Sequence, residues 1–401
     1  MVGRVERVHA TEAAIRAVAE DTLRLRALHF LKILDTRREE RFDRLVRIAQ
    51  RHFGVRAVAI NFIDADRQWT KAEEGLPGQA SEPLSESMCA HTVHANTTLV
   101  VPDAGEDDRF RHGKFVAQGV RFYAGHPIHA PGGQPIGSLC IVDTKPRELG
   151  DGEREDLADF AALVEREIAL TQELDRAAHV QQLLMPREAP SIAGYELAGL
   201  CVPARDIGGD FFAWQLVDGG RLQLHVSDIM GKGIPAALLA ASMRAAVVGA
   251  AQHNDQATAV AKVAAAADTI LGDTETYATL FSARLDPASG DLEYIDAGHG
   301  LAVILDVDGG FRRLPSSGLP VGLLSDDTWE LQRERLAPEE TLIVVSDGIL
   351  DLFPTLEEAI DYAVRGNAGR PTAERLVASA VALAETEGAQ DDVTVLALRR
   401  H

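Results

Sequence analysis

The spacing of hydrophobic residues in the N-terminal part of the chain switches between the helical period and the strand period. Apolar residues at helical spacing predict two helices within 11–53. Apolar runs bounded by turn residues predict a strand at 55–64, a second strand near Trp69, and a hairpin that joins 121–130 to 134–143 through Pro-Gly-Gly. This order of elements is typical of an α+β domain.

A long helical pattern from 151 to 184 separates this part from the rest of the chain. Its apolar residues are Leu157, Phe160, Val164, Ile168, Leu170, Leu174, Ala178 and Leu184. The period slips near Ile168, so the stripe is not a regular coiled-coil seam, and Pro186 ends the helix. Such a helix either packs on its own domain or pairs with its twin in a second chain. We favour the second interpretation, a homodimer formed through this helix.

The C-terminal half combines alanine-rich helical segments with strand-like runs. The helical segments are 235–251 and 256–271, and the runs are 277–286, 292–298, 301–307 and 341–347. Pro235 suits the first turn of a helix, and the alanines and leucines after it have high helix propensity. These elements predict an αββα sandwich. The expected fold class of the whole chain is α+β, with an N-terminal domain, a linker helix and this sandwich.

One hairpin of the sandwich carries an acid at each end. Strand-like runs at 211–217 and 221–226 flank an Asp-Gly-Gly turn, and Asp210 and Asp228 lie equally far from Gly219 at its centre. Directly opposed residues of an antiparallel pair have Cβ atoms about 4.5–5.5 Å apart. Two carboxylates at that distance repel each other unless a cation lies between them. The hairpin alone leaves two interpretations open, a metal site and two solvated turn residues.

Two further strands favour the metal site. Asp347 ends the buried run of 341–347, and Asp391 precedes the final strand of the chain. Four strands that begin or end with an aspartate can bring their carboxylates together at one edge of a sandwich. The candidate ligands are all oxygen donors, which suit magnesium or manganese better than zinc or copper.

Composition narrows the partners and the compartment. The 401 residues are 46% hydrophobic and 25% charged, as in soluble globular proteins, and the formal net charge is −21. That charge argues against nucleic acid or an anionic membrane as the main partner. The chain has three scattered cysteines and no apolar leader, and its most apolar segment, 235–251, is short and carries Arg244. We therefore expect a cytoplasmic protein without a membrane span.

Cys89, His91 and His94 are spaced as Cys-x-His-x-x-His, which fits no standard zinc pattern. We interpret them as core or pocket-lining residues of a short helix. Cys140 lies in an apolar strand and is interpreted as a small buried side chain, and His299 as a structural residue.

Six motifs follow one another in the C-terminal half, namely GGDFF, SDIMGKGIPAA, DAGHG, GLPVGLL, SDGILD and QDDVTVL. In this order they resemble the PPM metal-dependent protein phosphatases, and most of all their bacterial SpoIIE/RsbU-type branch. The N-terminal half resembles a GAF domain through FDRLVRIAQRHFGVRAVAINFID, SMCAHTV, VVPDAGEDDRF and GQPIGSLCIVD. The expected boundaries are 1–24 for an N-terminal helical extension, 25–170 for the GAF sensor domain, 171–190 for the linker helix and 191–401 for the phosphatase domain.

The resemblance implies hydrolysis of phosphoserine or phosphothreonine by water activated between two divalent cations, Mn(II) or Mg(II). Asp228 would bridge both ions, and the backbone carbonyl of Ile229 would be a further ligand. Asp347 and Asp391 would hold one ion, and Asp210 would act on the other, partly through water. Because two acids are adjacent in QDDVTVL, Asp392 is the alternative to Asp391.

The chain departs from the family pattern at two positions. Met230 stands where animal members have a histidine that serves the leaving group, and Ala213 stands where the branch usually has aspartate.

The branch also implies the substrate, a phosphorylated anti-sigma-factor antagonist of the STAS type. The GAF domain would bind an unidentified small ligand or none.

Two other functions compete with a phosphatase. Residues 208–212 resemble the GGDEF motif of diguanylate cyclases, but the glutamate of that motif is absent. The second is a non-enzymatic scaffold with a degenerate phosphatase domain, against which the intact acidic residues argue.

We further expect that movement of the linker helix against the helix that begins at Pro235 regulates the site, because the second helix follows directly on Asp228 and Ile229.

Overall fold

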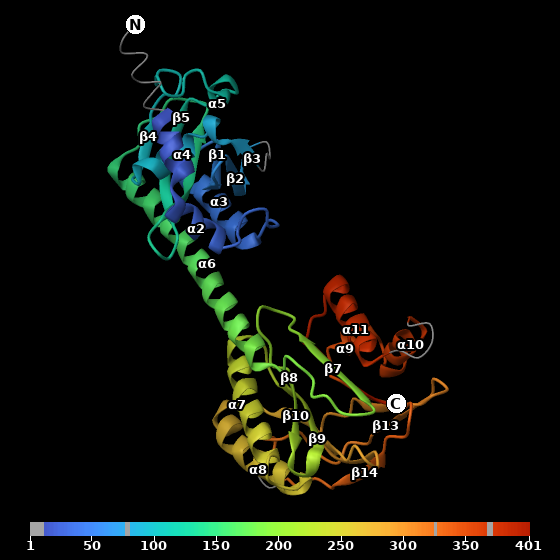
Figure 1. The fold of residues 1–401 in the computed structure, drawn as a ribbon. Coiled ribbons are helices and arrows are strands. Elements are labelled where there is room, and N and C mark those ends of the chain that lie inside the picture. Colours follow the sequence, from blue (N-terminus) through green and yellow to red (C-terminus); the bar gives the residue numbers. More distant parts are fainter. Residues whose placement is uncertain (1–11, 77–80, 325–326, 367–371) are drawn as a thin grey trace. The chain divides into compact units, whose positions relative to one another are not determined.

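The computed structural model describes residues 12–76, 81–324, 327–366 and 372–401. The chain divides into two compact units, Met1–Glu173 and Leu174–His401 (Figure 1). Helix α6 (Asp151–Leu184) begins in the first unit and continues into the second, as the long helical pattern predicts.

The first unit is built on one sheet of six strands in the order β3-β2-β1-β6-β5-β4. The strands are β1 (Ala57–Ile63), β2 (Arg67–Glu74), β3 (Ser81–Pro83), β4 (Leu99–Val101), β5 (Phe122–His129) and β6 (Pro135–Asp143). All neighbouring strands run antiparallel. The two predicted strands and the predicted hairpin are confirmed as β1, β2 and the β5–β6 pair.

Helices cover both faces of this sheet. They are α2 (Thr22–Phe30), α3 (Glu40–Phe53), α4 (Met88–Ala95), α5 (Lys114–Ala117) and the first part of α6, with a short 3-10 turn η1 (Leu84–Glu86). One core joins α2, α3 and α6 to alternate residues of β1, such as Val58 and Ile60. A second core joins α4 to the residues between them, such as Ala57 and Ala59. Because successive side chains of a strand point to opposite faces, the two cores lie on opposite sides of the sheet.

The prediction of two helices within 11–53 is wrong, because the described part of this segment holds three helical stretches, 12–20, α2 and α3. The side chain of Asp21 accepts a hydrogen bond from the backbone N–H of Arg24 at 3.0 Å and caps a new helix. Helix α2 ends before Leu34, which still packs, partly buried, against the same core. The helical spacing of the leucines therefore continues beyond the helix itself.

The second unit contains two five-stranded sheets, in the orders β14-β11-β10-β9-β8 and β13-β12-β15-β16-β7. The strands of the first are β8 (Phe211–Val217), β9 (Arg221–Ile229), β10 (Ala278–Leu285), β11 (Asp291–Ala297) and β14 (Gln332–Arg335). Those of the second are β7 (Tyr195–Val202), β12 (Ala302–Leu305), β13 (Phe311–Arg313), β15 (Thr341–Val345) and β16 (Val393–Arg400).

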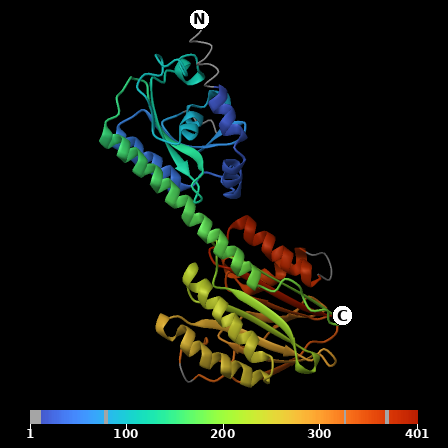
Figure 2. The ribbon, with the colours of Figure 1, turned by 60° about the vertical axis from the view of Figure 1, so that its left-hand side comes forward.

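Helices lie on the outer face of each sheet (Figure 2). They are α7 (Ile234–Ala251), α8 (Gln256–Leu271), α9 (Ile349–Leu352), α10 (Leu356–Gly366) and α11 (Ala373–Glu387), with 3-10 turns η2 (Asp218–Gly220) and η3 (Gly272–Thr274). One core lies between the sheets, one beneath α7 and α8, and one beneath α9, α10 and α11. The predicted αββα sandwich is therefore confirmed.

Helix α7 is long and apolar enough, by length and composition alone, to cross a membrane. Its buried residues recur about once per turn and are Ala236, Ala240, Met243, Val247 and Ala251. Most of them share a core with strand residues such as Phe211 and Ile229. This stripe is typical of a helix that packs on a sheet.

Candidate active site

The β8–β9 hairpin has the predicted register. Val217 pairs with Arg221 around the turn, and the pairs continue to Phe211 and Ser227. Gly219 lies at the centre of the turn with a φ of 81°, a conformation that favours glycine. Asp210, one residue before the last pair, therefore comes opposite Asp228, as the sequence predicts.

Asp210 is buried, with 2% of its surface exposed. Its Oδ2 accepts a hydrogen bond from the Thr394 hydroxyl at 2.7 Å, which ties the start of β8 to β16 in the other sheet. Burial, followed by the charge of Asp228, raises the pKa of Asp210 well above its usual value. The carboxyl at this position is thus close to a second acid and removed from solvent.

Asp228 lies in β9 and is half-buried. Burial, and after it the charges of Asp347 and Asp391, raise its pKa to about 7. Asp347 follows β15, and burial together with the charge of Asp391 raises its pKa as well. The structure therefore brings Asp210, Asp228, Asp347 and Asp391 close enough for their charges to act on one another.

The two adjacent acids at the start of β16 have different surroundings. Asp392 is buried, and its carboxylate accepts backbone hydrogen bonds from Ala204 at 2.8 Å and from Gly209 at 2.6 Å. Asp391 is partly exposed, and its Oδ2 lies 2.9 Å from the Lys232 ammonium. Asp392 thus anchors the loop before β8, whereas Asp391 faces a partly exposed cationic side chain at the surface of the acidic cluster.

Two glycines let the loop before β8 approach these acids closely. A Cβ on Gly208 would lie 2.1 Å from the Asp392 Oδ2, and a Cβ on Gly209 would lie 2.7 Å from the carbonyl oxygen of Ile229. No real Cβ tolerates either distance. The Gly-Gly-Asp sequence therefore places Asp210 beside both Ile229 and Asp392.

The cluster offers oxygen donors, namely carboxylates and a backbone carbonyl, which fit a hard divalent cation. A cation would also neutralise the mutual repulsion of the carboxylates. Among the residues that the structure describes, however, no group of three or more acidic, histidine or cysteine side chains is arranged to hold a metal ion as it stands. Asp210 is hydrogen-bonded to Thr394, and Asp391 is paired with Lys232.

The sequence did not reveal several residues that shape the cluster. The Ser346 hydroxyl donates to the Asp392 carbonyl at 3.0 Å, and Asp351 accepts hydrogen bonds from the backbone of Gln390 and Asp391 at 2.9 and 2.8 Å. Both belong to the SDGILD motif, which offered a signal in retrospect. Thr394 and Lys232 likewise lie within quoted motifs, QDDVTVL and SDIMGKGIPAA, next to candidate ligands.

Among the described residues, the histidines and cysteines singled out above are not grouped as metal ligands. On α4, His91 is buried edge-on against Phe110, and His94 is exposed. His299 is buried, its Nδ1 lies 3.1 Å from the Thr279 hydroxyl, and burial lowers its pKa to about 4. The interpretation as buried residues is confirmed for Cys89, His91, Cys140 and His299. It is wrong for His94, which is exposed.

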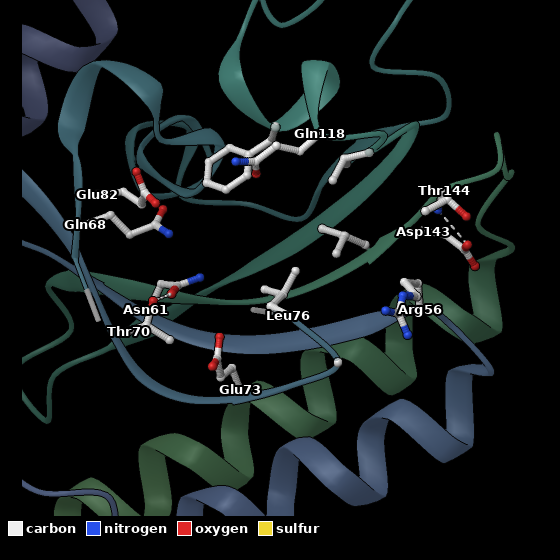
Figure 3. A pocket seen from close by; sticks show the side chains of 14 residues that line it. Arg56, Asn61, Gln68, Thr70, Glu73, Leu76, Glu82, Gln118, Asp143 and Thr144 are labelled. Atoms are coloured by element: carbon white, nitrogen blue, oxygen red, sulfur yellow. Dashed lines mark hydrogen bonds between the residues drawn. The ribbon is translucent and has the colours of Figure 1, made fainter. Parts of the chain in front are cut away.

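The first unit contains a cavity of about 370 Å³ next to its sheet (Figure 3). Its polar lining includes Asn61, Gln68, Thr70, Glu73, Glu82 and Arg56. The Thr70 hydroxyl donates to the Asn61 Oδ1 at 2.7 Å. The cavity is large enough for a small organic molecule.

Two protein families match the chain in succession. The GAF domain family matches residues 37–168, and the family described as stage II sporulation protein E (SpoIIE) matches residues 218–401.

Individual relatives match over parts of the chain. Protein IcfG of Synechocystis is 27% identical over 213 residues, which are 46% of this chain and 34% of IcfG, so the chain spans about a third of that relative. Phosphoserine phosphatase RsbU of Bacillus subtilis is 24% identical over 240 residues, 58% of this chain and 71% of RsbU. The SiaA-PP2C domain of Pseudomonas aeruginosa superposes with a TM-score of 0.51 at 22% identity, covering 59% of this chain and 99% of that domain, which is a likeness of fold.

Proposed function

The chain belongs to the proteins that join a GAF domain to a SpoIIE-class PPM phosphatase domain, and from this we propose that it is a metal-dependent protein-serine/threonine phosphatase. The observation that carries the proposal is the register of the β8–β9 hairpin, which sets Asp210 opposite Asp228. Burial, and after it the charges of Asp347 and Asp391, raise the pKa of Asp228 to about 7. Crowded carboxylates of this kind are stabilised when a cation neutralises them. The opposed pair of Asp210 and Asp228 adds to the same excess of negative charge.

The proposed ligands of two Mn(II) or Mg(II) ions are Asp210, Asp228, Asp347, Asp391 and the carbonyl of Ile229. Bound ions of this type activate water and neutralise phosphate oxygens. We propose Asp391 rather than Asp392, because both carboxylate oxygens of the buried Asp392 hold the loop before β8 through backbone hydrogen bonds. The half-exposed Asp391 contacts the backbone N–H of its neighbour and the Lys232 ammonium, which a cation could displace.

The surrounding residues hold the candidate ligands in position. Thr394 fixes the Asp210 carboxylate, and Asp392 fixes the loop that carries it. Lys232 places an ammonium beside Asp391. A lysine at the edge of such a site is also suited to attract the phosphate group of a substrate.

The wider assignment rests on the branch to which the domain belongs. We propose a phosphorylated signalling protein as the substrate, an anti-sigma-factor antagonist of the STAS type, and a sensor role for the GAF domain. Helix α6 exposes several large apolar residues, namely Leu163, Leu170, Val180, Leu183 and Leu184, which supports a homodimer formed along it. A cytoplasmic location is part of the same proposal.

Phosphate release tests the activity directly. The full chain with manganese is mixed with a phosphorylated STAS protein, and inorganic phosphate is measured. Asp228→Asn is expected to abolish release, because it replaces the carboxylate proposed to bridge both ions with a neutral amide. Asp218→Asn is the matched control, since Asp218 lies in the exposed turn of the same hairpin. Equal activity of wild type and Asp228→Asn would refute the proposal.

One observation favours the scaffold as a second candidate, namely that no described group of three acidic, histidine or cysteine side chains is arranged to hold a metal. Calorimetric titration of the wild-type chain with manganese separates the two. Binding that is lost in Asp228→Asn and kept in Asp218→Asn supports the phosphatase. Absence of binding supports the scaffold.

A further inference from the structure

Two cysteines far apart in the sequence meet beneath α4 in the first unit. Cys89 lies in α4 and Cys140 in β6, and both are buried in the same core, with 3% and 4% of their surfaces exposed. The Asn61 Nδ2 lies 3.4 Å from each sulfur atom. A single amide nitrogen that contacts both sulfurs places the two thiols next to each other.

The two thiols are chemically unlike. Cys89 is the second residue of α4, near the positive end of the helix, and the Tyr123 hydroxyl donates to its sulfur at 3.5 Å. Hydrogen bonding with Cys140 is the main cause that lowers the pKa of Cys89, and the same contact raises the pKa of Cys140. Cys89 is therefore the thiol better suited to react as a thiolate.

The two cysteines border a cavity of the first unit. Both cysteines line a cavity of about 40 Å³ whose other walls are mainly apolar, formed by residues such as Phe115 and Val120. Asn61, Phe115 and Val120 also line the larger cavity of about 370 Å³. The thiols thus lie beside a compartment that is wide enough for hydrogen peroxide or a small organic hydroperoxide.

We propose that Cys89 and Cys140 are a peroxide-sensitive dithiol that closes to a disulfide. The Cys89 sulfur attacks the outer oxygen of a hydroperoxide, ROOH. The O–O bond breaks, ROH leaves with the thiol proton, and Cys89 becomes a sulfenic acid. The Cys140 sulfur then attacks the Cys89 sulfur, the S–O bond breaks, and the hydroxyl leaves with the Cys140 proton as water. Two thiols lose two electrons and two protons, and the hydroperoxide becomes ROH and water.

The disulfide would bind α4 covalently to the middle of the sheet. A disulfide brings its sulfur atoms to about 2.05 Å, so α4 and β6 must move slightly toward each other when it forms. In a reducing compartment such a bond is transient, which suits a sensor. The inference concerns the GAF domain alone and does not depend on the proposed phosphatase activity.

The test uses the full wild-type chain, reduced and then freed of reductant. Hydrogen peroxide is added in increasing amounts, free thiols are blocked with N-ethylmaleimide, and the peptides are mapped by mass spectrometry. We expect one intramolecular bond between Cys89 and Cys140, with Cys201 still alkylated. No bond at a tenfold excess of peroxide, or a bond that includes Cys201, would overturn the proposal.

Single variants test the order of the two steps. In Cys140→Ala, the sulfenic acid on Cys89 has no resolving partner and is expected to be trapped by dimedone. Cys89→Ala is expected to give no dimedone adduct on Cys140, and Cys201→Ala is the control that keeps the disulfide. Dimedone labelling of Cys140 at a rate equal to that of Cys89 would contradict the roles assigned here.

Discussion

The different surroundings of Asp391 and Asp392 predict two separable defects. Asp392→Asn replaces an acceptor of short backbone hydrogen bonds, from Ala204 and Gly209, with an amide that can accept with only one of its two atoms. Hydrogen bonds to a charged group contribute roughly 1.5–3 kcal/mol each, so we expect a loss of about 2 kcal/mol. In a unit of this size, that lowers the midpoint of thermal unfolding by about 4–8 °C.

Asp391→Asn removes the half-exposed ion pair with Lys232 and leaves an amide oxygen able to accept the hydrogen bond that the Asp392 backbone N–H donates to the Asp391 Oδ1 at 2.9 Å. Pairs of this kind contribute about 0.2–1 kcal/mol, so the midpoint should change by a few degrees at most. If Asp391 is the ligand, however, the same change should weaken manganese binding at least tenfold.

Two measurements on each variant distinguish these effects. Differential scanning calorimetry in EDTA gives the stability of the second unit without metal, and isothermal titration gives the affinity for manganese. The reasoning is refuted if Asp391→Asn destabilises the metal-free chain as much as Asp392→Asn does. It is also refuted if Asp391→Asn binds manganese as tightly as the wild type.

Four further predictions follow from the structure. Lys232→Met removes the ammonium that competes for the acidic cluster and should tighten manganese binding about two- to fivefold in calorimetry, whereas weaker binding would contradict this. Gly208→Ala places a Cβ against the anchoring carboxylate and should lower stability by more than 1 kcal/mol in thermal unfolding, while Gly249→Ala, on α7 with open space around it, should be neutral or stabilising. Burial, then nearby arginines, lowers the pKa of His225 to about 3, so the fold excludes its protonated form and stability falls as the pH drops below about 6.5. The unfolding free energy of wild type should fall relative to that of His225→Leu by about 1.4 kcal/mol per pH unit in that range, and parallel curves would count against this. Deletion of residues 1–150 should change activity or metal affinity, and unchanged kinetics would argue against coupling between the two domains.

The parts of the site that the sequence could predict are those set by local chemistry. The Asp-Gly-Gly turn has a left-handed residue at its centre, Gly219, so the hairpin register and the opposition of Asp210 and Asp228 follow from counting residues. The αββα layers follow in the same way from the order and apolar character of the strands and helices.

Contacts between distant segments were beyond the reach of the sequence. The surroundings of Asp391 and Asp392 differ because backbone N–H groups before β8 approach one of them, and nothing near residue 390 indicates this. The meeting of Cys89 with Cys140 has the same origin, since it depends on how α4 crosses the sheet. The misjudged helix start is a different case, because the capping signal of Asp21 was present but weaker than the leucine period.

The acidic residues come from both sheets of the sandwich, Asp210 and Asp228 from one and Asp347 and Asp391 from the other. Any cation held by both pairs would fasten the two sheets together in the folded chain and would lose that site on unfolding. Such linkage adds about 2.7 kcal/mol at a ligand concentration one hundred times its dissociation constant. The melting temperature of the second unit would then report how full the site is, without any substrate. A substitution that loosens the packing between the sheets would weaken ion binding even if it changes no metal ligand.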